Sequence, residues 1–162
     1  MIFIVMGVAG CGKTTVGKLL AESLGYKYIE GDEYHPAENV KKMSSGIPLN
    51  DDDRYGWLVS LRKEIELSKA HDQGAVLTCS ALKEKYRKIL KQDDEDVKFI
   101  YLKGSFEAIK SRMEQRQNHY FKPSLLQSQF DTLEEPAYAF TADALAPAEE
   151  TVQNVLAEYA VL

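Results

Sequence analysis

The sequence contains few cysteines and no long apolar run. Its two cysteines, Cys11 and Cys79, are too few for a disulfide framework, and neither lies in a cluster of metal-binding type, so we expect free thiols. No apolar stretch approaches the roughly 18 residues that a membrane-spanning helix needs. The first residues, MIFIVMG, lack the basic leader and cleavage site of a signal peptide. We therefore expect a cytoplasmic protein without a membrane partner.

An excess of positive charge is absent as well. The chain has 20 Lys and Arg residues against 25 Asp and Glu residues, and the two signs are interspersed, which argues against nucleic acid as a main partner. A small anionic ligand is not excluded, because a local field can oppose the net charge of -5. The 162 residues, of which 44% are apolar and 28% charged, suit a single globular domain spanning 1–162.

Short apolar runs alternate with segments of helical periodicity along the chain. The continuous apolar run at 1–6 is typical of a strand buried on both faces. Further strands are expected at 26–30, 75–79, 97–102 and 142–145, and helices at 14–24, 39–43, 51–70, 82–90, 106–116 and 149–159. Gly25 is a natural stop for the first helix, and Asp51 is expected to cap the third.

This alternation predicts the fold class. Strands joined by helical crossovers indicate an α/β fold with a parallel sheet of about five strands, covered by helices on both faces. Such sheets bind ligands at the carboxyl ends of their strands. The polar and aromatic segment at 117–136 has weak periodicity, and we expect it to form a mobile lid.

The segment that follows the first strand contains a phosphate-binding sequence. GVAGCGKT at 7–14 fits G-x-x-x-x-G-K-[ST] at every fixed position, between a predicted strand and a predicted helix. Its glycines let backbone N–H groups turn toward phosphate oxygens, and the helix N-terminus adds a favourable dipole. Lys13 is expected to reach the β- and γ-phosphates, and the Thr14 hydroxyl to complete a Mg²⁺ shell. The predicted ATP-binding residues are Gly7, Val8, Ala9, Gly10, Cys11, Gly12, Lys13, Thr14 and Thr15.

A second polar cluster, GDEYHP at 31–36, follows the second predicted strand. In a short P-loop protein this strand end lies across the phosphate site from the loop. Asp32 is therefore our candidate for accepting or orienting the proton of an attacking hydroxyl, and His35 for binding the acceptor or steering Asp32. In the alternative interpretation, Asp32 caps the following turn and His35 is a partly buried loop residue. Asp32 can also serve beside Mg²⁺, since the third strand lacks the aspartate that many P-loop proteins use there.

Several segments together resemble the gluconate kinases, small P-loop enzymes related in fold to shikimate and adenylate kinases. The resemblance covers residues 2–136. The matching segments are GVAGCGKTT (7–15), GDEYHP (31–36), NVKKMSSGIPLNDDDR (39–54) with Trp57 and Leu58, CSALKEKYR (79–87), FIYLKG (99–104) and SQFDTLEEP (128–136). The stretch at 118–123 is a loose version of the family's lid sequence, and the last 25 residues carry no motif that we recognise.

The resemblance implies a P-loop kinase that uses ATP and Mg²⁺ to phosphorylate the 6-hydroxyl of D-gluconate. It places the enzyme in gluconate catabolism feeding the pentose phosphate pathway, and it implies a homodimer. Arg54, Lys83 and Arg87 are candidate cations for the gluconate carboxylate, although each can instead be a surface residue. Resemblance alone suggests Gln129 as a substrate contact.

Two arginines near the predicted lid are further candidates. Arg112 and Arg116 are four residues apart and hence on one helix face, so they can neutralise the γ-phosphoryl group when a lid closes. An exposed charged face would look the same in sequence. Ser80, after the third strand, can bind a Mg²⁺-held water or cap the next helix.

The three consecutive aspartates at 51–53 cannot all face one site, because side chains one and two apart on a helix point in different directions. One can cap the helix, and a second can orient Arg54 or bind acceptor hydroxyls. Competing functions are a kinase for shikimate or a nucleoside monophosphate, and a nucleotide-binding module without catalysis.

Overall fold

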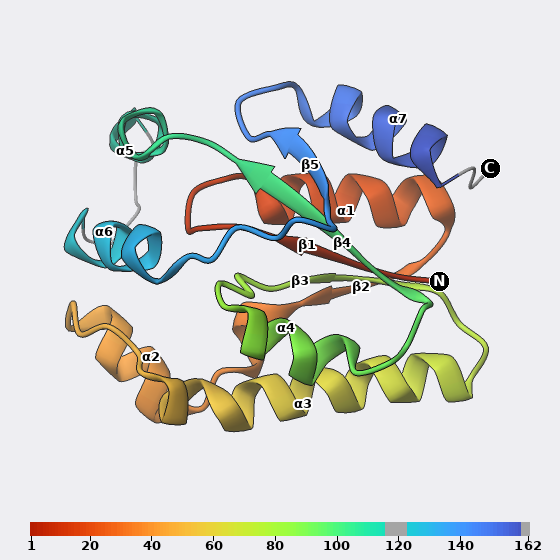
Figure 1. Ribbon diagram of the computed structural model, residues 1–162, viewed down its shortest axis with the longest axis horizontal. Helices are drawn as coiled ribbons and strands as arrows, with labels where there is room; N and C mark the ends of the chain where they lie inside the picture. Colours follow the sequence, from red (N-terminus) through yellow and green to blue (C-terminus); the bar gives the residue numbers. More distant parts are fainter. Residues whose placement is uncertain (116–122, 160–162) are drawn as a thin grey trace.

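The computed structural model describes residues 1–115 and 123–159, and its centre is a parallel five-stranded sheet (Figure 1). The strand order is β2-β3-β1-β4-β5, and every neighbouring pair is parallel. The strands are β1 (Ile2–Met6), β2 (Lys27–Glu30), β3 (Ala75–Thr78), β4 (Val97–Lys103) and β5 (Phe140–Asp143). All five residues of β1 are buried, as its continuous apolar run predicts.

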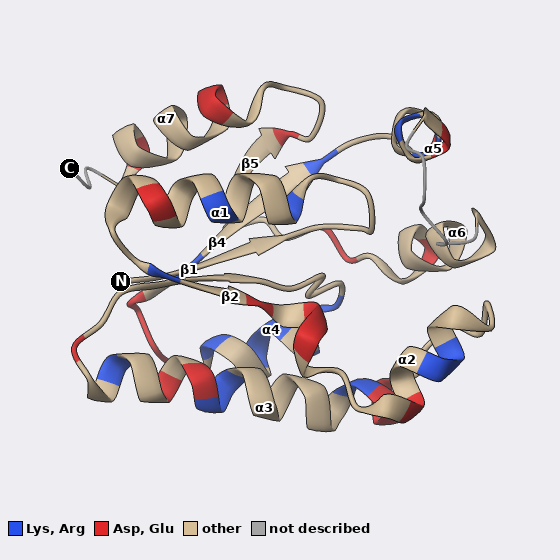
Figure 2. Ribbon diagram, turned by 180° about the vertical axis from the view of Figure 1, so that it is seen from behind, with Lys and Arg blue, Asp and Glu red and all other residues tan. Residues whose placement is uncertain are grey.

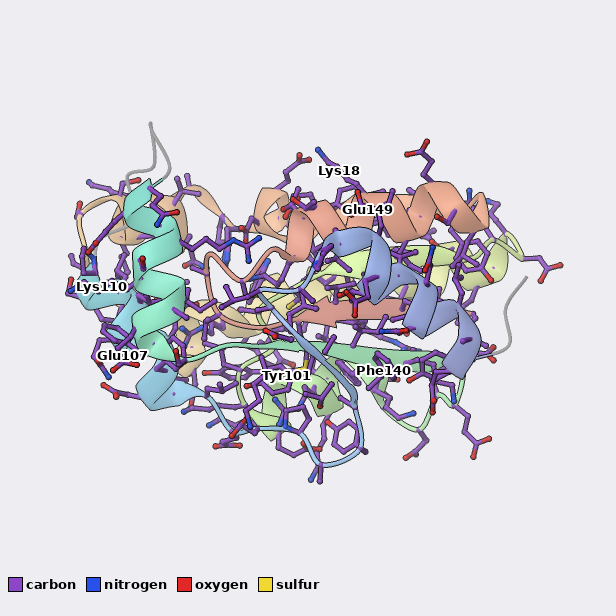
Figure 3. The ribbon with its side chains drawn as sticks, turned by 90° about the horizontal axis from the view of Figure 1, so that it is seen from above. Lys18, Tyr101, Glu107, Lys110, Phe140 and Glu149 are labelled. Atoms are coloured by element: carbon purple, nitrogen blue, oxygen red, sulfur yellow. The ribbon has the colours of Figure 1, made fainter. Side chains whose placement is uncertain are left out.

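Helices cover both faces of this sheet. In Figure 1, α1 and α7 lie on one face and α3 and α4 on the other, while α2, α5 and α6 gather beyond the carboxyl ends of the strands. The helices are α1 (Lys13–Leu24), α2 (Ala37–Ser44), α3 (Asp51–Ala70), α4 (Glu84–Lys91), α5 (Phe106–Gln115), α6 (Pro123–Thr132) and α7 (Ala148–Glu158). Seen from above, α7 lies beside α1 over the sheet (Figure 3).

The connections put the ligand-binding crevice next to β1. The chain leaves β1 toward β2 on one side of the sheet and reaches β4 on the other side of β1, so the strand order switches there. The phosphate-binding loop follows β1 directly, and the short 3-10 helix η1 (Gly31–Tyr34) follows β2 at the same edge. Charges of both signs are distributed over the outer helices (Figure 2). Among the described residues, no helix is long and apolar enough to cross a membrane.

The predicted α/β class is confirmed and all five predicted strands are present, the fifth at 140–143 instead of 142–145, but two further details differ. The prediction assigned no helix to 117–136, whereas 123–132 forms α6. Its Leu125 and Leu126 are buried, and polar Ser and Gln residues obscure the helical period between them and Phe130. Pro123 suits the first position of a helix, where its missing N–H is not needed.

The second difference concerns the start of α3, where the prediction of Asp51 as the cap was wrong by one residue. The Asn50 side chain accepts a hydrogen bond from the Asp53 amide at 2.8 Å, and the Asp53 carboxylate accepts one from the Asn50 amide at 2.9 Å. This reciprocal capping box satisfies two donors at the helix start. The Asp53 carboxylate also accepts from Lys42 Nζ at 2.9 Å, which ties α2 to α3.

We expect Asn50→Ala to lower the free energy of unfolding by about 1 kcal/mol, because the Asp53 amide loses its acceptor. Urea unfolding followed by circular dichroism measures this change. The matched control is Asp52→Ala, which removes a carboxylate from the same turn but outside the capping box. Equal losses in both variants would contradict the assigned cap.

Candidate active site

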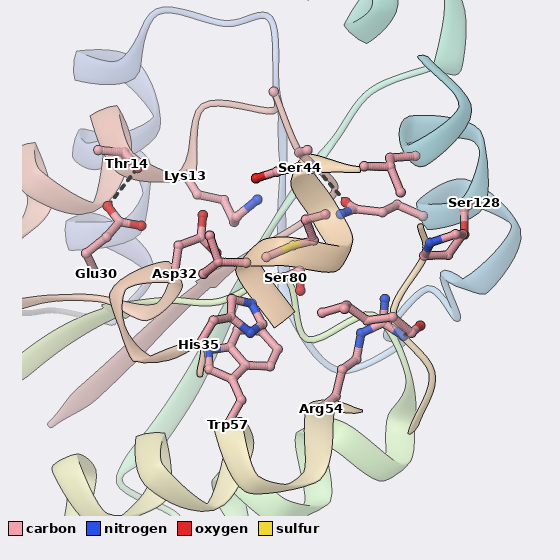
Figure 4. A pocket seen from close by; sticks show the side chains of 18 of the residues that line it. Lys13, Thr14, Glu30, Asp32, His35, Ser44, Arg54, Trp57, Ser80 and Ser128 are labelled. Atoms are coloured by element: carbon pink, nitrogen blue, oxygen red, sulfur yellow. Dashed lines mark hydrogen bonds between the residues drawn. The ribbon is translucent and has the colours of Figure 1, made fainter. Parts of the chain in front are cut away.

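A cavity of about 570 Å³ lies at the carboxyl ends of β1, β2 and β3 (Figure 4). The phosphate-binding loop forms one wall, η1 and the start of α3 form the opposite wall, and α2 and α6 contribute the sides. Its polar lining includes Lys13, Thr14, Thr15, Glu30, Asp32, His35, Arg54, Ser80, Ser128 and Gln129. The cavity therefore brings together residues from both polar segments that the sequence singled out.

The phosphate-binding loop has the backbone geometry that its glycines predict. Gly10 and Gly12 adopt φ angles of 79° and 97°, which side chains of L-residues rarely allow. Helix α1 begins at Lys13 without a side-chain cap and without an acidic residue in its first turn. Its first N–H groups and its dipole are therefore available to an anion. Lys13 Nζ donates to the carbonyls of Gly7 and Val8, each at 3.0 Å.

Glu30, at the end of β2, is a site residue that the sequence analysis missed. Its Oε2 accepts from the Thr14 hydroxyl at 2.9 Å (Figure 4) and from the Tyr28 hydroxyl at 2.5 Å, while Oε1 accepts from Thr78 at 2.9 Å. Burial and the bond to Glu30 raise the pKa of Tyr28 to about 12, so Tyr28 stays a hydrogen-bond donor. The signal in the sequence was a carboxylate at the last position of a strand, two residues before Asp32.

His35 is held flat against Trp57. The two rings stack with centroids 4.0 Å apart and planes inclined by 19°, and Trp57 Nε1 donates to the Gly31 carbonyl at 2.8 Å. Burial lowers the pKa of His35 to about 4; the Asp32 carboxylate opposes this shift and Arg54 adds to it. His35 therefore presents a neutral imidazole to the cavity at neutral pH, next to Asp32 on the same short segment.

Of the three candidate cations, the structure places only Arg54 at the cavity. Its side chain is 7% exposed, and Nη1 donates to the Leu49 carbonyl at 2.8 Å and to the Tyr86 hydroxyl at 3.2 Å. Tyr86 in turn donates to Asp51, so one of the three aspartates orients Arg54 through a tyrosine. None of the three aspartates lines the cavity.

Lys83 and Arg87 are engaged elsewhere. Lys83 Nζ pairs with Asp51 at 3.1 Å. Arg87 is 2% exposed, and its guanidinium donates to Glu84, the Tyr138 hydroxyl and the carbonyls of Ala81 and Glu134. Arg87 thus anchors the chain after α6 to α4, and neither cation belongs to the cavity lining.

Three of the remaining candidate residues contact or lie beside the phosphate-binding loop. Gln129, on α6, lines the cavity, and its Oε1 accepts from the Ala9 amide at 2.7 Å. Arg112 Nη1 donates to the Ala144 carbonyl at 2.7 Å, and its guanidinium lies beside Gly12 rather than in the cavity lining. Arg116 lies outside the described residues. Ser80 lines the cavity, and its carbonyl accepts from the Gly7 amide at 3.3 Å.

A phosphate-binding loop that faces a carboxylate, a neutral imidazole and a buried arginine across one cavity defines a P-loop kinase for a small molecule. The sequence model of the shikimate kinase family matches residues 9–161. A probable gluconokinase of Schizosaccharomyces pombe is 48% identical over 141 residues, which cover 83% of this chain and 73% of that protein. The thermoresistant gluconokinase of Escherichia coli is 39% identical over 156 residues, covering 96% and 89%. The chain belongs to the gluconokinase family.

The structural comparison agrees. A crystal structure of a gluconokinase from Sinorhizobium meliloti, 42% identical in sequence, has a TM-score of 0.87 and covers 98% of this chain and 90% of its own. A shikimate kinase from Aquifex aeolicus, 19% identical with a TM-score of 0.52, shares the fold. The predicted P-loop fold of the shikimate kinase type is therefore confirmed.

The lowered pKa of His35 predicts that this residue makes folding stability depend on pH. Between about pH 6.5, where an unfolded histidine titrates, and pH 4, the unfolded chain binds a proton at this residue that the folded chain does not. Stability contributed by His35 is therefore present above about pH 6.5 and is lost as the pH falls toward 4. Urea unfolding at several pH values should show that the free energy of unfolding falls less between pH 6.5 and pH 4 in His35→Gln than in the unaltered protein. If the free energy of unfolding depends on pH in the same way in both proteins, the lowered pKa of His35 is contradicted.

Proposed function

We propose that this protein transfers the γ-phosphoryl group of ATP to the 6-hydroxyl of D-gluconate, giving 6-phospho-D-gluconate and ADP. The observation that carries this proposal is the cavity that sets Asp32, His35 and Arg54 opposite the phosphate-binding loop. Its volume of about 570 Å³ lies within the range of about 300–1,000 Å³ that encloses small molecules. The gluconokinase names of the relatives indicate which acceptor fills it.

The nucleotide belongs on the loop side of the cavity. Amides of the loop and of the first turn of α1 bind the phosphates, and Lys13 exchanges its two loop carbonyls for phosphate oxygens. Arg112 donates to the Ala144 carbonyl, just after β5, and its guanidinium lies next to Gly12 of the loop. This position favours a contact with the nucleotide over one with the acceptor.

The residues present also fit a Mg²⁺ ion of the nucleotide-bound kind. Among the described residues, no cluster of three or more His, Cys, Asp or Glu forms a metal site by itself. Mg²⁺ in nucleotide enzymes is held by one or two protein oxygens with phosphates and water, and the hydroxyl of Thr14 beside the Glu30 carboxylate supplies such oxygens. The ion would contribute neutralisation of phosphate charge. Because Glu30 accepts the Thr14 proton, the lone pairs of the Thr14 hydroxyl would be left for the cation.

The acceptor belongs on the opposite side. Arg54 offers a charged N–H fork for the carboxylate of gluconate, held in place by Leu49 and Tyr86. Asp32 accepts the proton of the attacking hydroxyl, and the neutral imidazole of His35 contributes a hydrogen bond to the sugar acid. Gln129, on α6, lines the same cavity and is a further contact for the acceptor. The relatives that are 39–48% identical have gluconokinase names, which favours gluconate over shikimate, a nucleoside monophosphate or a non-catalytic module.

The test of the proposal is ADP release, coupled to a spectroscopic assay, with a panel of gluconate, other sugar acids, shikimate and nucleoside monophosphates. We expect gluconate to have the highest kcat/KM, and NMR of the product to show phosphate on carbon 6. Tight ATP binding with no turnover of any acceptor would instead support a regulatory module. The homodimer and the cytoplasmic location stay predictions; light scattering of the purified protein tests the first.

We expect Asp32→Ala to reduce kcat at least about a hundredfold, the low end for a positioned proton acceptor, while ATP affinity stays nearly unchanged. Steady-state kinetics and calorimetric ATP binding measure the two quantities. Glu33→Ala is the matched control, because Glu33 is the exposed neighbour of Asp32 and does not line the cavity. An Asp32→Ala variant that loses Mg²⁺–ATP binding in proportion to its rate would assign Asp32 to the metal side.

We expect Arg54→Lys to raise the KM for gluconate at least about tenfold, because an ammonium group cannot donate two parallel hydrogen bonds to a carboxylate. Lys83→Ala, which removes a cation paired with Asp51 outside the cavity lining, is expected to change that KM far less. The KM for ATP should stay constant in both variants. A larger effect of Lys83→Ala on the gluconate KM would move the carboxylate site to α4.

A further inference from the structure

The orientation of one buried amide is fixed by its surroundings. Asn39, on α2, is 2% exposed and does not line the cavity. Its Nδ2 donates to the main-chain carbonyl of Asp53 at 2.8 Å. A carbonyl oxygen can only accept hydrogen bonds, so the nitrogen of this amide, and not its oxygen, must face Asp53. The assignment of nitrogen and oxygen therefore follows from the chemistry of the partner.

The same nitrogen decides which ring nitrogen of His35 is protonated. Asn39 Nδ2 lies 3.2 Å from His35 Nδ1. An amide nitrogen has two N–H groups and does not accept hydrogen bonds, so Nδ1 must be the acceptor and carries no proton. In a neutral imidazole the proton then lies on Nε2. With Nδ1 turned to Asn39, Nε2–H is the one N–H group that the ring can offer to a ligand in the cavity.

The environment of the ring keeps it in the neutral form that this tautomer requires. Trp57 stacks on its face, and burial keeps the imidazole neutral against the pull of the nearby Asp32 carboxylate. Arg54, the other charged group that acts on His35, also disfavours a second proton. A hydroxyl group has one proton to donate and two lone pairs to accept with. Asp32 as acceptor and His35 as donor thus complement the two functions of a sugar hydroxyl.

We propose that Asn39 is a positioning residue that holds His35 in the Nε2–H tautomer, so that His35 donates a hydrogen bond to a hydroxyl or carboxylate oxygen of the acceptor. The identity of that acceptor rests on the proposed function, whereas the tautomer itself does not. A His35 ring with its proton on Nδ1 would present a lone pair to the cavity beside the Asp32 carboxylate. Two acceptors would then compete for one hydroxyl proton.

Nitrogen-15 NMR of the free, unaltered protein reads the tautomer directly. The chain has only three histidines, and the His35 signals are assigned by their loss in His35→Gln. We expect an unprotonated Nδ1 and a protonated Nε2 at neutral pH. In Asn39→Asp the carboxylate can only accept, so the proton should move to Nδ1 or the ring should become doubly protonated. A proton on Nδ1 in the unaltered protein overturns the proposal, and this measurement needs no substrate.

A double-mutant cycle separates positioning from general structural support. We expect Asn39→Ala to lower kcat/KM for gluconate about tenfold, the equivalent of one lost hydrogen bond to the acceptor. Glutamine donates through its amide N–H groups and has no tautomer that Asn39 could set. In a His35→Gln background, Asn39→Ala should therefore lower kcat/KM far less. Equal losses in the two backgrounds overturn the proposal, because they assign Asn39 a merely structural role.

Lys42→Met is the matched control, because Lys42 and Asn39 both connect α2 to Asp53 on α3. It removes the Lys42 contact to the Asp53 carboxylate and leaves the Asn39 amide in place. We expect the His35 tautomer to be unchanged in this variant; a shifted tautomer would overturn the specific role of Asn39. Absence of turnover with gluconate overturns the proposed function alone, because the NMR measurement still decides the tautomer.

Discussion

The carboxylate of Glu30 accepts hydrogen bonds from hydroxyl groups on three elements, and the site depends on this junction. Thr14 reaches it from α1, Tyr28 from β2 and Thr78 from β3. Thr78 also accepts from the Gly31 amide at 3.2 Å. At Gly31 the backbone approaches β3 so closely that a Cβ atom would lie 1.9 Å from the Thr78 carbonyl oxygen, so only glycine fits. The phosphate-binding loop and the opposite cavity wall, formed by η1 and the start of α3, are thereby fixed to the same strand ends.

A continuous series of contacts extends from this junction across the acceptor wall. The Gly31 carbonyl accepts from Trp57, Trp57 stacks on His35, and His35 accepts from Asn39. Asn39 then reaches the main chain at the start of α3, where the capping box sets the first turn that carries Arg54. Hydrogen bonds at both ends of the series and the ring stack between them hold each group against the next. His35 and Arg54, the two residues proposed to bind the acceptor, therefore share one framework.

The sequence predicted the parts of this site that depend on local pattern and missed those that depend on distant partners. The phosphate loop and the strands follow from spacing and apolar runs, and Asp32 and His35 follow from their place after β2. Glu30 was missed because its partners Thr14 and Thr78 are 16 and 48 positions away. Arg87 resembled a substrate cation, but its direction is set by Glu134, which lies 47 positions along the chain. Asn39 begins one of the segments that resemble the family, but the resemblance assigns it no role, and its role follows only from its contacts with His35 and Asp53.

The contact between α6 and the phosphate loop has a thermodynamic consequence. The Gln129 side chain holds the Ala9 amide, a donor in the loop that is built to receive phosphate oxygens. If a phosphate oxygen of a nucleotide accepts from the Ala9 amide, Gln129 Oε1 loses this hydrogen bond. The Gln129 side chain would then be free to bind a ligand in the same cavity. Occupancy of the loop side would in that case change the affinity of the cavity for a second ligand, and such linkage acts with equal strength in both directions.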